Sequence, residues 1–113
     1  MAENTTGDSG VLGTVYLLHF VDKETGRSAR YRHAAHYCGW ALDPATRLHQ
    51  HRSGGDKASP LIKAALGSGL DFVLARKWVQ VDRHFERRLK DSGSMVRHCP
   101  ICQSERIVCP VMQ

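Results

Sequence analysis

Apolar residues follow one another almost without interruption along residues 11–20, and the run VLGTVYLLHF is rich in β-branched and aromatic side chains. A short apolar run of this kind predicts a buried strand. Residues 35–41 and 71–81 have a similar composition and predict two more strands. The third strand is expected to place four side chains on one side of its pleat: Phe72, Leu74, Arg76 and Trp78. The polar residues 22–33, with turn chemistry at Thr25-Gly26, predict a long hairpin connection between the first two strands.

Three helix starts follow from capping chemistry. Asp43-Pro44 and Ser59-Pro60 each combine a capping side chain with a proline at the first helical position, where no backbone donor is lost. Asp82 offers a third cap. The predicted helices cover residues 44–51, 60–66 and 83–90, and glycines follow each of them.

The order of elements is therefore strand, strand, helix, helix, strand, helix. This order predicts an α+β fold in which helices flank a small mixed or antiparallel sheet. The chain has 113 residues, which is the size of one domain. We assign that domain to residues 11–93, with residues 1–10 as a flexible tail and residues 94–113 as a cysteine-containing C-terminal extension.

Charge is distributed unevenly along the chain. There are 16 basic and 11 acidic residues, a net charge of +5, and hydrophobic residues make up 42%. Residues 31–113 hold 13 Lys/Arg and 7 Asp/Glu, so the excess positive charge lies in the body and favours a polyanionic partner. The composition argues against extended disorder and against a membrane span. Residues 1–10 lack the features of a secretory signal, so we expect a cytoplasmic protein with reduced cysteines.

Two strands carry tyrosines in short motifs, Thr14-Val15-Tyr16 and Tyr37-Cys38-Gly39. Arg47 and His51 follow in the first helix, and Glu86 lies near the start of the third. In this order and context the residues resemble the GIY-YIG nuclease superfamily, over roughly residues 13–90. The resemblance implies a metal-dependent endonuclease that hydrolyses phosphodiester bonds.

The resemblance also implies a role for each motif residue. Glu86 would hold Mg²⁺ or Mn²⁺, and Arg47 would bind the phosphate with its planar, permanently charged fork. Tyr16 would act as the general base and Tyr37 as its positioning partner, although the sequence equally allows the reverse. His51 would hydrogen-bond the tyrosines or the phosphate. The base is either a phenolate with a strongly lowered pKa or a neutral tyrosine that relays a proton.

Thr14 and Trp40 depart from the family pattern, because the first motif lacks its glycine and members often carry lysine or a small hydroxyl residue after the second. The connection between the two motifs is also longer than usual. These departures favour an alternative function, a catalytically inactive nucleic-acid-binding module of the same fold. Taken singly, Tyr16 and Tyr37 would be core residues, and Glu86 would pair with Lys90 on a helix surface.

DNA is the expected partner. We expect little intrinsic sequence specificity, because the chain has no room for a separate recognition domain. Gly39 would let the nucleic acid approach the backbone closely. Arg32, Arg52 and Lys57 would contact phosphates. The protein would act as a monomer or homodimer, or through recruitment by a protein partner.

Cys99, Cys102 and Cys109 have a spacing that suits a zinc site, since Cys-x-x-Cys closes a small chelate around a tetrahedral ion. The fourth ligand would be His98, His84 or a residue brought in by folding, and the alternative is reduced thiols without a metal. A zinc-stabilised protein-interaction domain is a third functional hypothesis. Cys38 is interpreted as a small buried hydrophobic residue rather than a nucleophile.

Overall fold

The computed structural model describes residues 11–93 and 95–111, with side chains as far as residue 105. Its elements in chain order are β1 (Gly13–Asp22), β2 (His36–Ala41), α1 (Pro44–Ser53), α2 (Pro60–Gly67), β3 (Leu70–Val81), α3 (Arg83–Asp91), the 3₁₀ helix η3 (Met95–His98) and α4 (Pro100–Val111).

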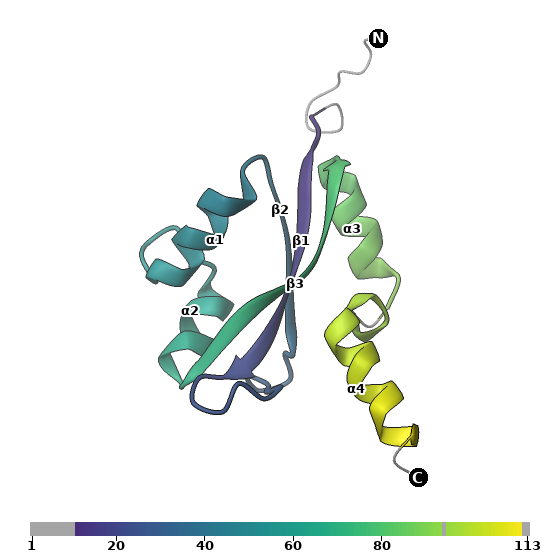
Figure 1. Ribbon diagram of the computed structural model, residues 1–113. Helices are drawn as coiled ribbons and strands as arrows, with labels where there is room; N and C mark the ends of the chain where they lie inside the picture. Colours follow the sequence, from purple (N-terminus) through teal and green to yellow (C-terminus); the bar gives the residue numbers. More distant parts are fainter. Residues whose placement is uncertain (1–10, 94, 112–113) are drawn as a thin grey trace.

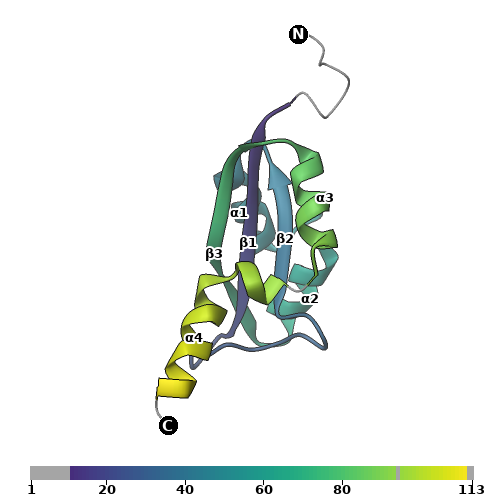
Figure 2. The ribbon, with the colours of Figure 1, turned by 90° about the vertical axis from the view of Figure 1, so that its right-hand side faces the viewer.

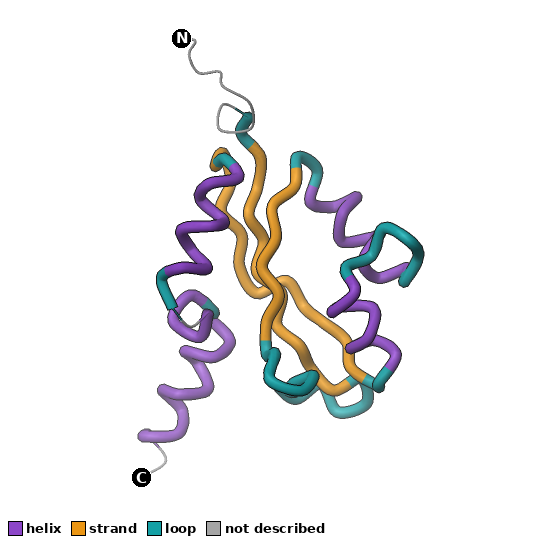
Figure 3. Tube along the Cα trace, turned by 180° about the vertical axis from the view of Figure 1, so that it is seen from behind, coloured by secondary structure: helices purple, strands orange, loops and turns teal. Residues whose placement is uncertain are grey.

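The three strands form one antiparallel sheet in the order β2-β1-β3. Helices α1 and α2 cover one face, and α3 with α4 lies on the other, so the sheet is the middle of three layers (Figures 1 and 3). This confirms the predicted α+β class. Helix α4, which was not predicted, occupies most of the C-terminal extension. Pro100, at the first position of α4, is the signal that would have indicated it.

Strand β1 is central and is buried on both faces, which explains its nearly continuous apolar sequence. Tyr16, Leu18 and Phe20 point toward α1 and α2, where they join a cluster with Ile62, Ala65, Leu70 and Phe72. Val15 and Leu17 point the other way and pack with Cys38, Leu89 and Cys99. The alternation of β1 therefore gives the molecule two small cores, one on each side of the sheet.

Two of the three predicted caps form as expected. The Asp43 carboxylate accepts hydrogen bonds from the Thr46 backbone N–H and hydroxyl, and the Asp82 carboxylate accepts one from the Phe85 N–H. Ser59 precedes α2 but makes no side-chain capping bond. There the structure corrects the prediction: Ser59 occupies the N-cap position without a side-chain bond, and Pro60, whose fixed φ suits the first helical position, marks the start of α2.

A β-bulge corrects the predicted face of β3. Leu18 pairs with Leu74 and Leu17 with Arg76, so Ala75 is an extra residue on β3. The bulge reverses the alternation, and Phe72 and Trp78 therefore lie in opposite cores instead of on one side. The prediction that these side chains share one face was wrong.

Candidate functional site

The two motif tyrosines lie side by side on the face of the sheet covered by α1 and α2. Tyr16 is paired with Gly39 across β1 and β2, and Tyr37 with Leu18, so both phenols point to the same side. Their ring centroids are 6.3 Å apart. A Cβ atom at Gly39 would lie 2.5 Å from the Tyr16 hydroxyl oxygen. The space that the sequence analysis reserved for nucleic acid at Gly39 is therefore filled by the phenol of Tyr16.

His51 reaches this pair from α1 and is completely buried. Its Nε2 lies 2.9 Å from the Tyr16 hydroxyl, and its Nδ1 accepts a hydrogen bond of 3.1 Å from the Ser59 backbone N–H. A backbone N–H only donates, so Nδ1 must be unprotonated and the ring proton of the neutral imidazole lies on Nε2. His51 consequently donates to the Tyr16 oxygen. Burial, reinforced by the charge of Arg47, lowers the pKa of His51 to about 4.

Arg47 lies one turn before His51 on α1. Its guanidinium donates to the Gln50 side-chain oxygen at 3.1 Å and to the Lys57 carbonyl, which fixes its direction. Its charge and its hydrogen bond to Tyr16 both act to lower the pKa of that phenol. Five N–H donors are available on a guanidinium, so these bonds leave capacity for a phosphate.

The protonation of Tyr16 is decided by burial. Loss of solvent, followed by the nearby Tyr37, raises the pKa of Tyr16 far above its ordinary value, and Arg47 offsets only part of this. The charge of Glu86 adds a smaller rise. Tyr16 is therefore a neutral phenol at pH 7. Without substrate or metal, a phenolate base does not fit this environment, and a neutral tyrosine that relays a proton does.

Glu86 lies in the first turn of α3, on the other side of the sheet from α1. Its carboxylate pairs with Lys90 at 2.7 Å, the contact expected of an ordinary helix pair, yet its side chain is only 19% exposed. Its charge makes a small contribution that raises the pKa of Tyr16, and it also raises the pKa of Cys38. Tyr16, Tyr37, Arg47 and His51 thus form one group, whereas Glu86, which the sequence analysis placed with them, lies on the other side of the sheet and contacts Lys90.

A hollow of about 490 Å³ lies against the same helix. Its described lining consists of Arg83, His84, Glu86, Arg87 and Lys90. The single carboxylate is therefore surrounded by basic side chains, an arrangement that suits an anionic group more than a free cation.

The three basic residues expected to contact phosphates differ in their surroundings. Arg52 is already engaged, since it pairs with Asp71 at 2.6 Å, donates to the Phe72 carbonyl at 3.1 Å and stacks 4.2 Å from the Phe72 ring centroid. Arg32 and Lys57 are exposed, in the connections before β2 and after α1. The DNA-binding role of Arg32 and Lys57 stays a prediction, whereas the guanidinium of Arg52 is already held by Asp71 and Phe72, and we expect it to stabilise the fold instead.

Trp40 and Thr14, the departures from the family pattern, have structural partners. The Trp40 indole N–H donates to the Val81 carbonyl at 2.9 Å, and its ring lies on the α3 side, away from Tyr16. Thr14 is buried opposite Ala41. Close backbone approach occurs one residue earlier, at Gly13, where a Cβ would lie 2.7 Å from the Ala41 oxygen.

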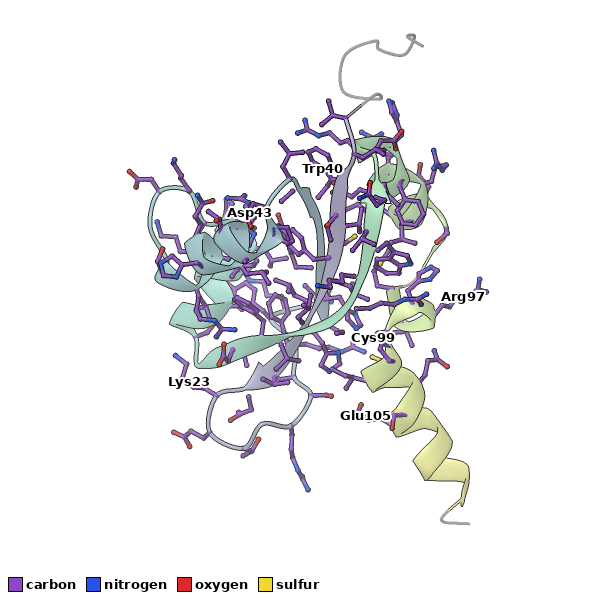
Figure 4. All side chains as sticks on the ribbon, turned by 45° about the horizontal axis from the view of Figure 1, so that its top comes forward. Lys23, Trp40, Asp43, Arg97, Cys99 and Glu105 are labelled. Atoms are coloured by element: carbon purple, nitrogen blue, oxygen red, sulfur yellow. The ribbon has the colours of Figure 1, made fainter. Side chains whose placement is uncertain are left out.

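A second group of side chains occupies the opposite face of the sheet. His19, His36, Cys99 and Cys102 bring their ligand atoms within 4.8 Å of one another and could hold a metal ion (Figure 4 labels Cys99). Sequence reasoning identified the two cysteines but missed both histidines, which face each other across β1 and β2. His19 lies three residues after Tyr16 and His36 one residue before Tyr37. Both offsets are odd, so strand alternation places the two histidines on the face opposite the tyrosines, and this was the available signal.

The other expected zinc ligands do not join this group. His98 contacts the Ser92 hydroxyl at 3.2 Å and the Trp78 ring, and His84 lines the hollow on α3. Of the alternatives for the fourth ligand, the structure favours a residue brought in by folding over His98 or His84. The side chain of Cys109 lies outside the described residues. Cys38 is buried, and burial raises its pKa to about 11, in agreement with its interpretation as a hydrophobic residue.

Comparison with known proteins gives no relative: no family model matches the chain, and neither does a curated protein or a solved structure. Among residues 11–93 and 95–111, no helix has the length and apolar composition that a bilayer crossing demands.

Proposed function

We propose that this chain is a metal-dependent endonuclease that hydrolyses phosphodiester bonds in DNA, as its resemblance to the GIY-YIG superfamily implies. The observation that supports this most strongly is the grouping of Tyr16, Tyr37, Arg47 and His51, which come from two strands and a helix. A core tyrosine needs one partner for its hydroxyl. Tyr16 instead has a histidine, a guanidinium and a second phenol beside it.

The hydrogen bonds of Tyr16 suit a proton relay. Because His51 and Arg47 both donate to the phenolic oxygen, negative charge that develops there during the reaction is stabilised. The phenol passes its proton to a phosphate oxygen and takes one from the attacking water, so its charge is transient. This role requires no phenolate in the free protein, which agrees with the raised pKa of Tyr16.

Arg47 would bind the scissile phosphate. Its guanidinium is held in direction by Gln50 and the Lys57 carbonyl. A positioned fork neutralises charge on phosphate oxygens and loses little freedom on binding. Tyr37, whose ring meets His51 edge-on at 5.3 Å, would hold the histidine and Tyr16 in place.

Glu86 is the residue that would hold Mg²⁺ or Mn²⁺. Its carboxylate is a suitable ligand, since Mg²⁺ commonly takes one or two carboxylates and completes its shell with water and substrate oxygens. The bound ion would polarise the scissile phosphate and stabilise the departing oxygen. Lys90 now pairs with this carboxylate, so the ion would enter together with the anionic substrate.

Plasmid nicking tests the proposal. With Mg²⁺ we expect the pure protein to convert supercoiled DNA to nicked circles, and Glu86→Gln to lose this activity while retaining DNA binding. Asp91→Asn, which removes a carboxylate from the far end of the same helix, is the matched control and should cut normally. If the unaltered protein binds DNA in a salt-sensitive way but never cuts it, the inactive binding module is correct instead.

A further inference from the structure

The His19, His36, Cys99 and Cys102 group has the dimensions of a tetrahedral zinc site. His19 Nδ1 lies 3.2 Å from His36 Nε2, 3.4 Å from Cys99 Sγ and 3.7 Å from Cys102 Sγ, and Cys102 Sγ lies 3.4 Å from His36 Nε2. Ligand atoms around tetrahedral zinc are about 3.3 to 3.8 Å apart, as its usual bond lengths require. These four separations are close to those of ligands around one ion, and all four ligand atoms lie within 4.8 Å of one another.

The hydrogen bond that His19 makes to Ser28 leaves its other ring nitrogen, Nδ1, unprotonated. The Ser28 hydroxyl donates to the Glu105 carboxylate on α4, so its oxygen accepts from His19 Nε2, 2.7 Å away. Nε2 then carries the ring proton, and the lone pair of Nδ1 points into the group. A serine and a carboxylate that orient a ligating histidine in this way are typical support for a metal site. Figure 4 shows Glu105 further along the helix that begins beside Cys99.

We propose that these four side chains bind one Zn²⁺ ion as a structural site. Two neutral histidines and two thiolates balance the charge of the ion, which lets the site be buried on the sheet without a further counterion. All four positions are filled by protein, so no place remains for a reacting water. Sulfur and imidazole ligands suit zinc and do not suit Mg²⁺, which keeps this site separate from the one proposed at Glu86.

The site joins three segments that are far apart in the sequence. His19 and His36 face each other on β1 and β2, and Cys99 and Cys102 lie at the start of α4. Figure 2 shows α4 crossing the strands at this point and then extending past the sheet. Zinc would therefore fasten both the edge strand β2 and the C-terminal helix to the central strand. Tyr37 directly follows His36 and points to the opposite face.

Metal analysis of the full chain, purified in a reducing buffer without chelator, tests the proposal and involves no DNA. We expect one zinc ion per chain, with loss of zinc in Cys102→Ser. His98→Gln and Cys109→Ser alter the residues that the sequence alone suggested, and both should keep the metal. Ser28→Ala should keep all four ligands but bind zinc about 10- to 100-fold more weakly.

Alkylation of the unaltered protein gives a second test, which does not depend on whether the variants fold. With zinc bound, Cys99 and Cys102 should resist iodoacetamide, and a chelator should expose both to labelling, read by peptide mass spectrometry. Cobalt in place of zinc should give the visible absorption of a tetrahedral ion with thiolate ligands. The proposal is overturned if the chain neither contains nor takes up zinc, or if Cys109→Ser loses it. Equal labelling of Cys99 and Cys102 with and without metal would also overturn it.

Discussion

Tyr16 is subject to opposing influences on its acidity. Burial and Tyr37 raise its pKa, whereas two donors, His51 and Arg47, approach its oxygen and favour the charged form. The sequence suggested which residues would meet but not which influence dominates, because burial depends on α1 and α2 covering the phenol. The same dependence applies to His51, whose ring proton is fixed by the Ser59 backbone N–H, eight residues away.

Gly39→Ala should displace the Tyr16 hydroxyl, because the added Cβ would lie 2.5 Å from it and within 2.7 Å of the ring. We expect a destabilisation of about 1–3 kcal/mol from overpacking, measured by urea unfolding. Cleavage should fall by more than the loss of folded protein explains. Gly67→Ala, at the end of α2 where a Cβ meets nothing within 4 Å, is the matched control and should have little effect on either measurement. Unchanged cleavage in Gly39→Ala would contradict the role of the Tyr16 position.

The low pKa of His51 makes stability depend on pH. In the unfolded chain this histidine gains a proton below about pH 6.5, whereas in the folded protein it does so only near pH 4. Stability should therefore fall as the pH drops from about 6.5 toward 4, by up to about 1.4 kcal/mol per pH unit from this group. Urea unfolding of the unaltered protein and His51→Gln, in the same metal state, should show a shallower slope for the variant. Parallel slopes would show that His51 titrates normally.

At the level of elements, short sequence signals correctly predicted the features that depend only on neighbouring residues, such as helix caps. Asp43 and Asp82 cap their helices because the bond each makes lies within three residues. The bulge at Ala75 was not predictable in this way, because it is defined by which residues of β1 lie opposite. A second bulge at Gln80, which has a φ of 58°, could not be predicted from the sequence for the same reason. The alternating pattern of β3 was consequently assigned to the wrong faces.

Helix α4 should depend on zinc for its attachment to the sheet. Stripping the metal with a chelator is expected to make the chain after Asp91 susceptible to limited proteolysis, because Cys99 and Cys102 would lose their links to β1 and β2. The products, identified by mass spectrometry, should include an intact fragment ending near residue 93. Added zinc should restore resistance. Identical digestion with and without chelator would mean that apolar packing alone holds α4.

At the level of the whole molecule, β1 and β2 carry the tyrosine group on one face and the His/Cys group on the other, and α3 with Glu86 lies on the second face. Tyr16 and Tyr37 point to the α1 side, and His19 and His36 to the α4 side. The order of the motifs predicted that Tyr16, Tyr37, Arg47 and His51 would meet, but it also placed Glu86 with them, and Glu86 lies on the other side of the sheet. It could not predict the His/Cys group, because residues 80 or so positions apart meet there only after α4 has crossed the sheet.

Salt dependence of DNA binding should identify the phosphate contacts. Arg32→Ala and Lys57→Ala are each expected to reduce the slope of log affinity against log salt by about 1, the change for one lost contact. Arg52→Ala should leave the slope unchanged and lower stability instead, because its guanidinium pairs with Asp71 and stacks on Phe72. Fluorescence anisotropy with a short duplex at several salt concentrations makes the comparison. A lower slope for Arg52→Ala alone would reverse this assignment.

The most direct test of the account is whether Tyr16 and Glu86 act on one phosphodiester. Single-turnover cleavage of DNA in Mg²⁺ would be measured for the unaltered protein, Tyr16→Phe, Glu86→Gln and the double variant. We expect Tyr16→Phe to cost about a hundred- to ten-thousand-fold in rate, and the double variant to be little slower than the slower single variant. Multiplying losses, or an unaltered protein that does not cut DNA, would contradict a shared catalytic site.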